Sequence, residues 1–142
     1  MPIQIETLTS LAETDRGAIF QSLSAYNDAH VGPSHYAPLA IVLRDEAGTQ
    51  LGGLWGHLYY DWLFIELLFV PEAVRGQGFG SRLLADAEAA AREKGCVGIW
   101  LDSFSFQAPG FYLKHGFEVW GTLDDYPRGH RRVFLRKRLA GP

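Results

Sequence analysis

Glycines at three alternate positions stand between an apolar segment and a helical pattern, and their spacing suits the binding of an anion. The stretch at residues 75–81 reads Arg-Gly-Gln-Gly-Phe-Gly-Ser and follows the apolar segment 63–70. Gly76, Gly78 and Gly80 leave their backbone N–H groups free of obstruction by side chains. A helix that begins here adds the positive end of its dipole. This stretch therefore predicts the binding of a phosphorylated small molecule.

Two other glycine-rich phosphate loops do not fit the same stretch. A P-loop has a lysine between its last glycine and the Ser or Thr that follows, whereas here Ser81 directly follows Gly80. A dinucleotide-binding turn has a glycine at the position where Ser81 stands. A tight turn that binds no ligand stays open as the structural alternative.

The composition is that of an ordinary globular protein. Of the 142 residues, 47% are hydrophobic and 20% are charged, and the net charge is −3. We expect one domain over residues 1–142 with a real hydrophobic core. A weakly negative chain has no general attraction to nucleic acid or to an anionic membrane. The basic segment 128–138 contains Val133, Phe134 and Leu135, which favours a strand with solvated charges over a nucleic-acid site.

A single cysteine and the N-terminal sequence indicate the compartment. Cys96 has no second cysteine to pair with, which excludes an intramolecular disulfide, disfavours a zinc site and suits a reducing environment. The N-terminus has neither the basic start nor the apolar core of a signal peptide. No apolar run approaches the roughly 20 residues that span a bilayer. We therefore expect a cytoplasmic protein that binds no metal.

The pattern of apolar residues and turns predicts a mixed α/β fold, in which one strand–helix–strand unit forms the centre of the sheet. A right-handed crossover makes strands 63–70 and 96–102 parallel neighbours. Both alternating sets of residues in strand 63–70 are apolar, so we expect it to be covered on both faces. The other expected elements are a strand at 3–5, a helix through 19–26, a hairpin of strands 39–44 and 50–60, a helix after the glycines with its apolar stripe at Leu83, Leu84, Ala87 and Ala91, a short helix from Pro109, and an antiparallel pair at 117–123 and 133–139.

This order of elements resembles the GNAT superfamily of N-acyltransferases over nearly the whole chain. Arg75, Gly78 and Gly80 meet the Arg/Gln-x-x-Gly-x-Gly/Ala pattern of its acyl-CoA-binding motif. Residues 108–117, Ala-Pro-Gly-Phe-Tyr-Leu-Lys-His-Gly-Phe, resemble the A-x-x-F-Y-x-K-x-G-F block of the family. The resemblance implies a central mixed sheet of six or seven strands flanked by helices, with two parallel central strands that splay apart.

The resemblance also implies acetyl-CoA as co-substrate. In the family, the strand before the glycine turn offers unpaired backbone groups to the pantetheine arm, and here these belong to Leu68 and Val70. Ser105 stands where many relatives have an asparagine that touches the pantetheine, which puts that contact in doubt. Lys114 either approaches the 3′-phosphate or is solvated. The residues expected to hold the pyrophosphate are Arg75, Gly76, Gln77, Gly78, Gly80 and Ser81.

Tyr112 and Glu66 are the candidate catalytic residues. Tyr112 matches the tyrosine that many family members use as general acid. A phenol, with a pKa near ~10, is comparable to an alkyl thiol and can protonate a thiolate leaving group. A packed aromatic beside Phe111 is the alternative. Glu66 lies in a strand that we expect to be buried, where a raised pKa would make it a usable base for the amine, directly or through a water. A structural ion pair is its alternative.

The acceptor pocket is expected near several aromatic residues. Trp55, His57 and Tyr59 alternate along one strand, and Tyr126 lies in the loop at 124–130. Aromatic rings with carboxylates nearby suit a cationic amine. A histidine that is satisfied in the core or at the surface is the alternative for His57. An exposed aromatic surface fits a homodimer interface equally well.

Together these features predict an N-acetyltransferase that moves an acetyl group from acetyl-CoA to a primary amine, of a small molecule or a peptide, by direct attack in a ternary complex. A covalent route through Cys96 is not expected. Two alternatives stay open. One is a non-catalytic acyl-CoA-binding module, and the other is an enzyme that uses another acyl-CoA or acylates a protein amine.

Overall fold

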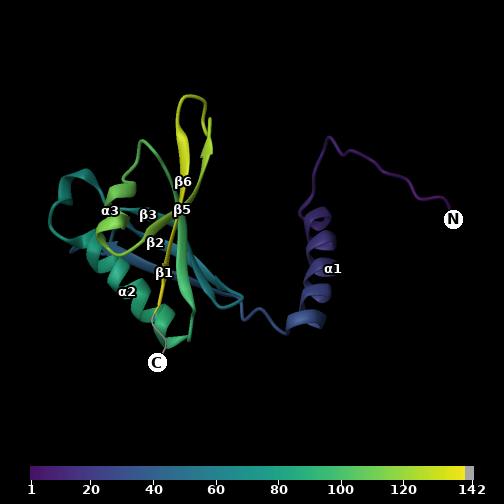
Figure 1. The fold of residues 1–142 in the computed structure, drawn as a ribbon, viewed down its shortest axis with the longest axis horizontal. Helices are drawn as coiled ribbons and strands as arrows, with labels where there is room; N and C mark the ends of the chain where they lie inside the picture. Colours follow the sequence, from purple (N-terminus) through teal and green to yellow (C-terminus); the bar gives the residue numbers. More distant parts are fainter. Residues whose placement is uncertain (140–142) are drawn as a thin grey trace. The chain divides into compact units, whose positions relative to one another are not determined.

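The computed structural model describes residues 1–139, which form two units, one over residues 1–34 and one that begins at His35. The first unit contains helix α1 (Glu13–Val31), preceded by an extended segment (Figure 1). The helix ends before Gly32, where the backbone takes a positive φ of 85°. No helix among the described residues is long and apolar enough to cross a membrane.

The strand expected at residues 3–5 is not formed. Ile3 and Ile5 are exposed, and neither belongs to a strand. A β-strand exists only with a partner that accepts and donates its hydrogen bonds, and residues 1–34 contain no second strand. The alternation of isoleucine with polar residues was therefore not sufficient evidence for a strand.

Residues 35–139 form one mixed sheet of six strands, within the six or seven predicted. The spatial order is β1-β2-β3-β4-β6-β5, and β3 and β4 are the parallel pair. Asp45 closes the β1–β2 turn by accepting hydrogen bonds from the N–H groups of Ala47 and Thr49. The strands are β1 (Ala37–Arg44), β2 (Gln50–Tyr59), β3 (Trp62–Phe69), β4 (Gly98–Phe104), β5 (Glu118–Asp124) and β6 (Arg131–Arg138).

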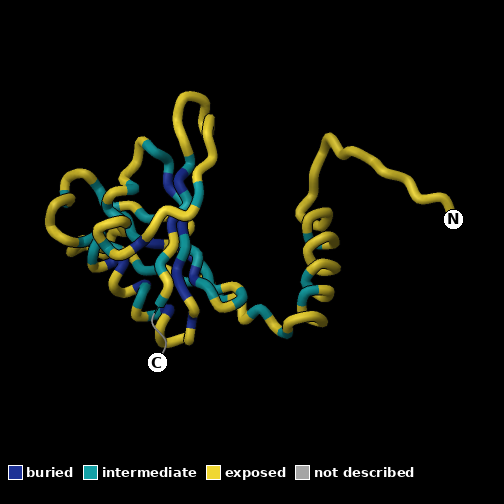
Figure 2. The backbone as a smooth tube through the Cα atoms, in the orientation of Figure 1, coloured by how far each residue is buried: buried dark blue, intermediate teal, exposed yellow. Residues whose placement is uncertain are grey.

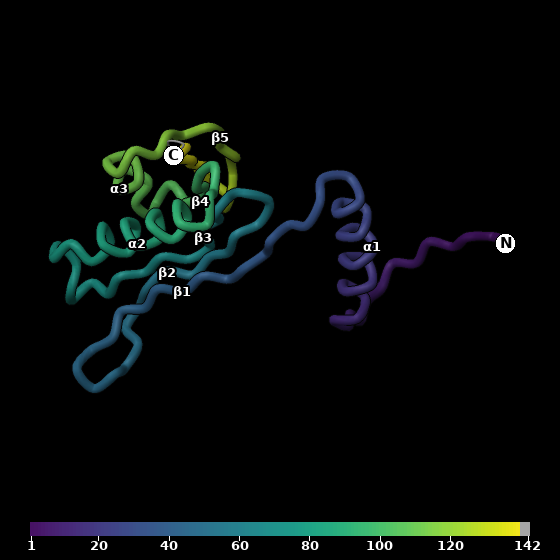
Figure 3. The backbone as a smooth tube through the Cα atoms, turned by 90° about the horizontal axis from the view of Figure 1, so that it is seen from below, coloured from purple at the N-terminus to yellow at the C-terminus, as the bar shows by residue number. Residues whose placement is uncertain are grey.

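Helix α2 (Phe79–Glu93) covers one face of this sheet and supplies much of the core. Figure 3 shows the helix running alongside β3. Its buried residues are the predicted stripe of Leu83, Leu84, Ala87 and Ala91. They pack against the inward-facing residues of the strands, which are dark blue in Figure 2. The largest fully buried side chains there are Leu63, Ile99, Leu101 and Leu135.

Two short helices complete the connections around α2. A 3₁₀ turn, η1 (Glu72–Val74), leads from β3 to the glycines, and α3 (Pro109–Lys114) follows β4. Pro109 occupies the first turn of α3, where its missing N–H is not needed. Apart from the strand expected at residues 3–5, the order of the strands and α-helices and the parallel pair were thus predicted correctly from the sequence.

A β-bulge in β3 was not predicted. The register pairs Gly56 with Ile65 and Trp55 with Leu67, which leaves Glu66 as an extra residue in β3. Before the bulge, Leu63 and Ile65 face the core. After it the alternation is shifted by one residue, so that Leu68 and not Leu67 packs against the core.

The expectation that β3 is covered on both faces is wrong, because the residues that the bulge turns to the face opposite α2 are exposed. Leu67 and Phe69 were expected to share the buried face of Leu63, but they are 61% and 55% exposed. A strict period of two cannot be continued across an inserted residue, because a shift of one position turns every later side chain to the other face.

The sheet face opposite α2 carries a row of aromatic rings. Tyr36, His57, Phe64 and Trp100 contact one another in that order, with ring centroids 5.4, 5.4 and 4.3 Å apart. The row crosses β2, β3 and β4. It extends the aromatic character that the sequence showed around β2.

Candidate functional site

The two parallel strands separate at the level of the bulge. β3 and β4 pair from Trp62 opposite Gly98 to Ile65 opposite Leu101. Beyond these residues each strand continues for several positions, and within residues 35–139 no ladder joins them. The predicted splay of the central strands is therefore present, and it opens toward the carboxyl ends of β3 and β4.

Leu68 and Val70 lie on the splayed part of the chain, but their backbone groups have different partners. Leu68 pairs with Leu54 of β2 and has no described ladder partner on β4. The carbonyl of Val70 accepts a hydrogen bond of 2.8 Å from Nε of Arg75. This carbonyl was expected to be unpaired, and the Arg75 side chain corrects that part of the prediction.

The glycine turn enters α2 through residues in the left-handed region. Gly76 and Gly78 have φ angles of 81° and 83°, and Gly78 is the N-cap residue of the helix. An added Cβ at either position would meet no atom within 4 Å. These two glycines are required by the backbone conformation, and the space around them is open to a ligand.

Gly80 has a different role. An added Cβ there would lie 3.0 Å from the ring of Phe111, which belongs to α3. The absence of a side chain at Gly80 lets α2 and α3 approach closely. The amino-acid pattern does not indicate this contact, because the two residues are far apart along the chain.

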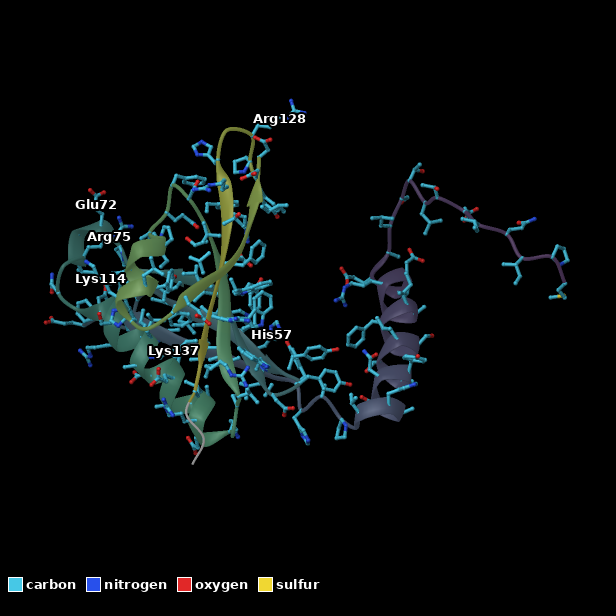
Figure 4. The ribbon with its side chains drawn as sticks, viewed as in Figure 1. His57, Glu72, Arg75, Lys114, Arg128 and Lys137 are labelled. Atoms are coloured by element: carbon cyan, nitrogen blue, oxygen red, sulfur yellow. The ribbon has the colours of Figure 1, made fainter. Side chains whose placement is uncertain are left out.

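The first turn of α2 presents free N–H groups. The first helical hydrogen bond of α2 runs from the Arg82 N–H to the Gly78 carbonyl, at 3.1 Å. The amides of residues 79–81 precede this bond and point out of the helix N-terminus, where the helix dipole is positive. Figure 4 shows Arg75 and Lys114 at this end of the unit, and the side chains of Arg75, Gln77 and Lys114 are all exposed.

Tyr112 is held on α3 by aromatic packing. Its ring meets the rings of Phe111 and Phe117 at 5.2 and 5.9 Å and packs against the core. Burial raises the pKa of the Tyr112 phenol above its usual value. A raised pKa keeps the phenol protonated, which is the state that a proton donor needs.

Glu66 is exposed, which corrects the expectation that it is buried. The physical reason is the bulge, which takes Glu66 out of the regular alternation of β3. No cation within residues 1–139 forms an ion pair with it, so the alternative of a structural ion pair is wrong. Glu66 lies one residue beyond the last paired position of the β3–β4 ladder.

The four acceptor candidates fall into two groups. Trp55, His57 and Tyr59 share one face of β2, with Trp55 and Tyr59 exposed and His57 half-buried between the rings of Tyr36 and Phe64. Tyr126 lies in the β5–β6 loop, where its ring is 5.7 Å from that of Phe104. No ring contact in the described chain joins Tyr126 to the β2 group, so the structure does not gather all four.

An ion pair between Asp102 and Arg132 was missed by the sequence analysis. Asp102 directly follows Leu101, the last β4 residue in the parallel ladder, and pairs with Arg132 of β6. The Arg132 guanidinium lies 4.4 Å from the Phe104 ring and 4.8 Å from the Tyr126 ring. This cluster holds the β5–β6 loop against the end of β4. The only sequence signal was a carboxylate at the end of an apolar strand.

The surroundings of Ser105 and Cys96 indicate a structural role for each residue. The Ser105 hydroxyl accepts a 3.0 Å hydrogen bond from the Arg131 N–H and ties the end of β4 to the start of β6. Cys96 is buried, and burial followed by the charge of Asp61 raises the pKa of its thiol. The thiolate form is therefore disfavoured, which agrees with the expectation that Cys96 is not a nucleophile.

Comparisons with known proteins show what this chain is similar to. The family model described as Acetyltransferase (GNAT) family matches residues 5–117. The chain is 42% identical over 128 residues to Acetyltransferase Atu2258 of Agrobacterium fabrum, which covers 90% of this chain and 93% of that protein. It is 46% identical over 95 residues to Blasticidin-S acetyltransferase of Streptomyces morookaense, with coverage of 66% and 70%.

Solved structures share the same fold. The 1.9 Å crystal structure of an acetyltransferase from Bacillus cereus matches with a TM-score of 0.85 and 38% sequence identity, over 94% of this chain and 98% of that chain. The mixed sheet of six strands over residues 35–139, with its flanking helices, is thus the architecture of GNAT acetyltransferases.

Proposed function

This chain belongs to the GNAT acetyltransferase family, and on that basis we propose that it moves an acetyl group from acetyl-CoA to a primary amine. The observation that carries the proposal is the position of the glycine turn. The turn follows β3 at the carboxyl end of the parallel pair, where β3 and β4 have already separated. Backbone donors and an open splay therefore occur at the same edge of the sheet.

The turn has the donors that a pyrophosphate needs. The amides of residues 79–81 and the dipole of α2 supply positive potential, and Gly76 and Gly78 leave the approach open. Arg75 supplies a cation whose Nε is anchored on Val70. Acetyl-CoA is the co-substrate that fits these groups, and no residue of the proposed reaction requires a metal.

The proposed reaction is a direct attack in a ternary complex. The amine nitrogen attacks the acetyl carbon, and the carbon–sulfur bond breaks as the amide bond forms. The Leu68 N–H stabilises the negative oxygen of the tetrahedral intermediate, a contribution that can reach about 3 kcal/mol. Tyr112 gives its proton to the CoA thiolate, and Glu66 accepts the proton of the amine, directly or through a water. The exposure of Glu66 favours the route through water.

The proposed acceptor is a cationic primary amine of a small molecule or a peptide. Aromatic rings lie on β2 and in the β5–β6 loop, and Glu66 supplies a carboxylate one residue beyond the last paired position of the β3–β4 ladder. One relative is named for the acetylation of blasticidin S, so amino-containing antibiotics belong in the first acceptor panel, beside polyamines, amino acids and lysine peptides.

Calorimetric titration of the purified protein with acetyl-CoA tests the proposal, with NAD and ATP as controls. We expect saturable binding of acetyl-CoA alone, and then release of free CoA thiol when an accepted amine is added. Binding without thiol release for any amine would favour a non-catalytic acyl-CoA-binding module. A folded sample that does not bind acetyl-CoA would overturn the proposed function.

A further inference from the structure

Ser81, in the first turn of α2, is linked to His115 at the end of α3. The Ser81 Oγ lies 3.0 Å from Nε2 of His115, and both residues are half-buried. The ring of Phe111 packs beside the His115 ring, with 4.8 Å between the ring centroids. The hydroxyl that follows the three glycines is therefore held by an imidazole from another element, 34 residues away.

The position of His115 is itself fixed from the sheet. Lys137 of β6 donates a hydrogen bond of 2.9 Å to the His115 carbonyl and forms an ion pair with Glu88 of α2. Figure 4 shows Lys137 beside α2. Ser81, Glu88, His115 and Lys137 line one cavity of about 160 Å³. These contacts anchor the backbone of His115 to α2, and the hydrogen bond with Ser81 places its imidazole at the first turn of that helix.

The direction of the Ser81–His115 hydrogen bond decides what Ser81 offers to a ligand. A serine hydroxyl has one proton. When Ser81 donates that proton to Nε2, it has none left for an anion at the helix N-terminus. When Nε2 carries a proton, His115 donates to Ser81, and the serine proton is free to be donated to a phosphate oxygen. The neutral imidazole with its proton on Nε2 is sufficient for this arrangement.

We propose that His115 is a positioning residue that directs the Ser81 hydroxyl toward a phosphate oxygen of the bound acyl-CoA. The inference rests on the proposed function, because it requires that the turn at residues 75–81 binds CoA. It adds a residue from outside the glycine turn to the cofactor site. It also links α3, which carries Tyr112, to the binding of CoA at that site.

The first test observes the proton directly. Protein labelled with ¹⁵N-histidine is compared with and without saturating CoA by two-bond ¹H–¹⁵N correlation, which distinguishes protonation at Nε2 from protonation at Nδ1. The chain has five histidines, and the His115 signal is assigned by its loss in His115→Gln. We expect CoA to increase the Nε2–H form of His115 and Ser81→Ala to abolish this response. A His115 side chain that carries no proton on Nε2 at saturation would overturn the inference.

The second test measures affinity. Ser81→Ala and His115→Leu are each expected to weaken CoA binding by about 5- to 20-fold, the loss of one charge-assisted hydrogen bond. The double variant is expected to bind no more weakly than either single variant, because the two side chains act as one unit. His115→Gln, whose amide N–H can replace the Nε2–H, is expected to stay within about threefold of the unsubstituted protein.

The outcomes separate this inference from the proposed function. Additive effects of the two substitutions, or equal losses in His115→Gln and His115→Leu, would contradict the positioning role while leaving CoA binding intact. An unsubstituted protein that does not bind CoA would refute the proposed function, and the inference with it. His35→Gln, at an exposed histidine before β1, is the control and is expected to change neither measurement.

Discussion

A Cβ atom on Gly80 of α2 would lie 3.0 Å from the Phe111 ring of α3. The last glycine of the turn is therefore the point at which the proposed cofactor site contacts the helix that carries the proposed general acid. Gly78, two residues earlier, has a positive φ of 83° and open space around it. The same residue type thus meets two different physical requirements within three positions.

Replacement of these glycines by valine is expected to abolish or strongly weaken CoA binding for two different reasons. At Gly78, the left-handed backbone costs a side chain about 1–2 kcal/mol, and the turn loses its shape. At Gly80, the new side chain displaces Phe111 and with it α3. Calorimetric titration with CoA, together with thermal unfolding, checks both. Gly110→Ala is the control, since a Cβ there meets no atom within 4 Å. Retained CoA affinity in Gly78→Val would contradict the assignment of the turn.

Substitution of Glu66 by glutamine separates catalysis from stability. Glu66 is exposed and forms no ion pair within residues 1–139, so the free energy of unfolding should change by less than about 0.5 kcal/mol. If Glu66 accepts the amine proton, kcat should fall by about 10²-fold. The rate of thiol release with an accepted amine, measured beside urea unfolding, distinguishes these effects. An unchanged kcat would remove Glu66 from the mechanism.

Substitution of Tyr112 by phenylalanine should lower turnover without loss of cofactor. The ring packing against Phe111 and Phe117 is kept, so the dissociation constant for CoA should stay within about twofold. Loss of the proton donor should reduce kcat by about 10²-fold. Because burial raises the pKa of this phenol, the donor form should persist in the native protein up to at least about pH 10. Turnover equal to that of the unsubstituted protein would leave Tyr112 with a packing role only.

The Glu88–Lys137 contact should contribute stability that depends on pH. The hydrogen bond from Lys137, above all, lowers the pKa of Glu88 below its ordinary 4.5, while burial acts in the opposite direction. A carboxylate with a lowered pKa in the folded state stabilises the protein above about pH 4.5, and this contribution is lost as the pH falls through the folded pKa.

Glu88→Gln should therefore destabilise the protein at pH 7, by about 1 kcal/mol or less for a partly exposed pair. The difference from the unsubstituted protein should shrink below about pH 4.5. Urea unfolding at pH 7 and at pH 3.5 measures it. Glu93→Gln, at an exposed residue of the same helix, is the matched control. A difference that stays constant across this pH range would show that the effect of Glu88→Gln does not come from its charge.

The sequence by itself was sufficient for the order of the strands and α-helices from α1 onward and for the location of the turn. The stripe from Leu83 to Ala91 follows from the period of an α-helix, and the parallel pairing of β3 with β4 follows from the handedness of the crossover. The glycines at 76 and 78 indicated a turn because few other residues adopt a positive φ. The stripe and the glycines are local properties of the chain, and the parallel pairing follows from a general rule for two strands that one helix connects.

Only the tertiary structure decided what surrounds the candidate site. The bulge at Glu66 depends on the register between β2 and β3, and a period of two along one strand carries no information about its partner. The contacts of Gly80 with Phe111 and of Ser81 with His115 join α2 to α3 across about 30 residues of sequence. Such contacts arise from the packing of whole elements, so no spacing within a single segment predicts them.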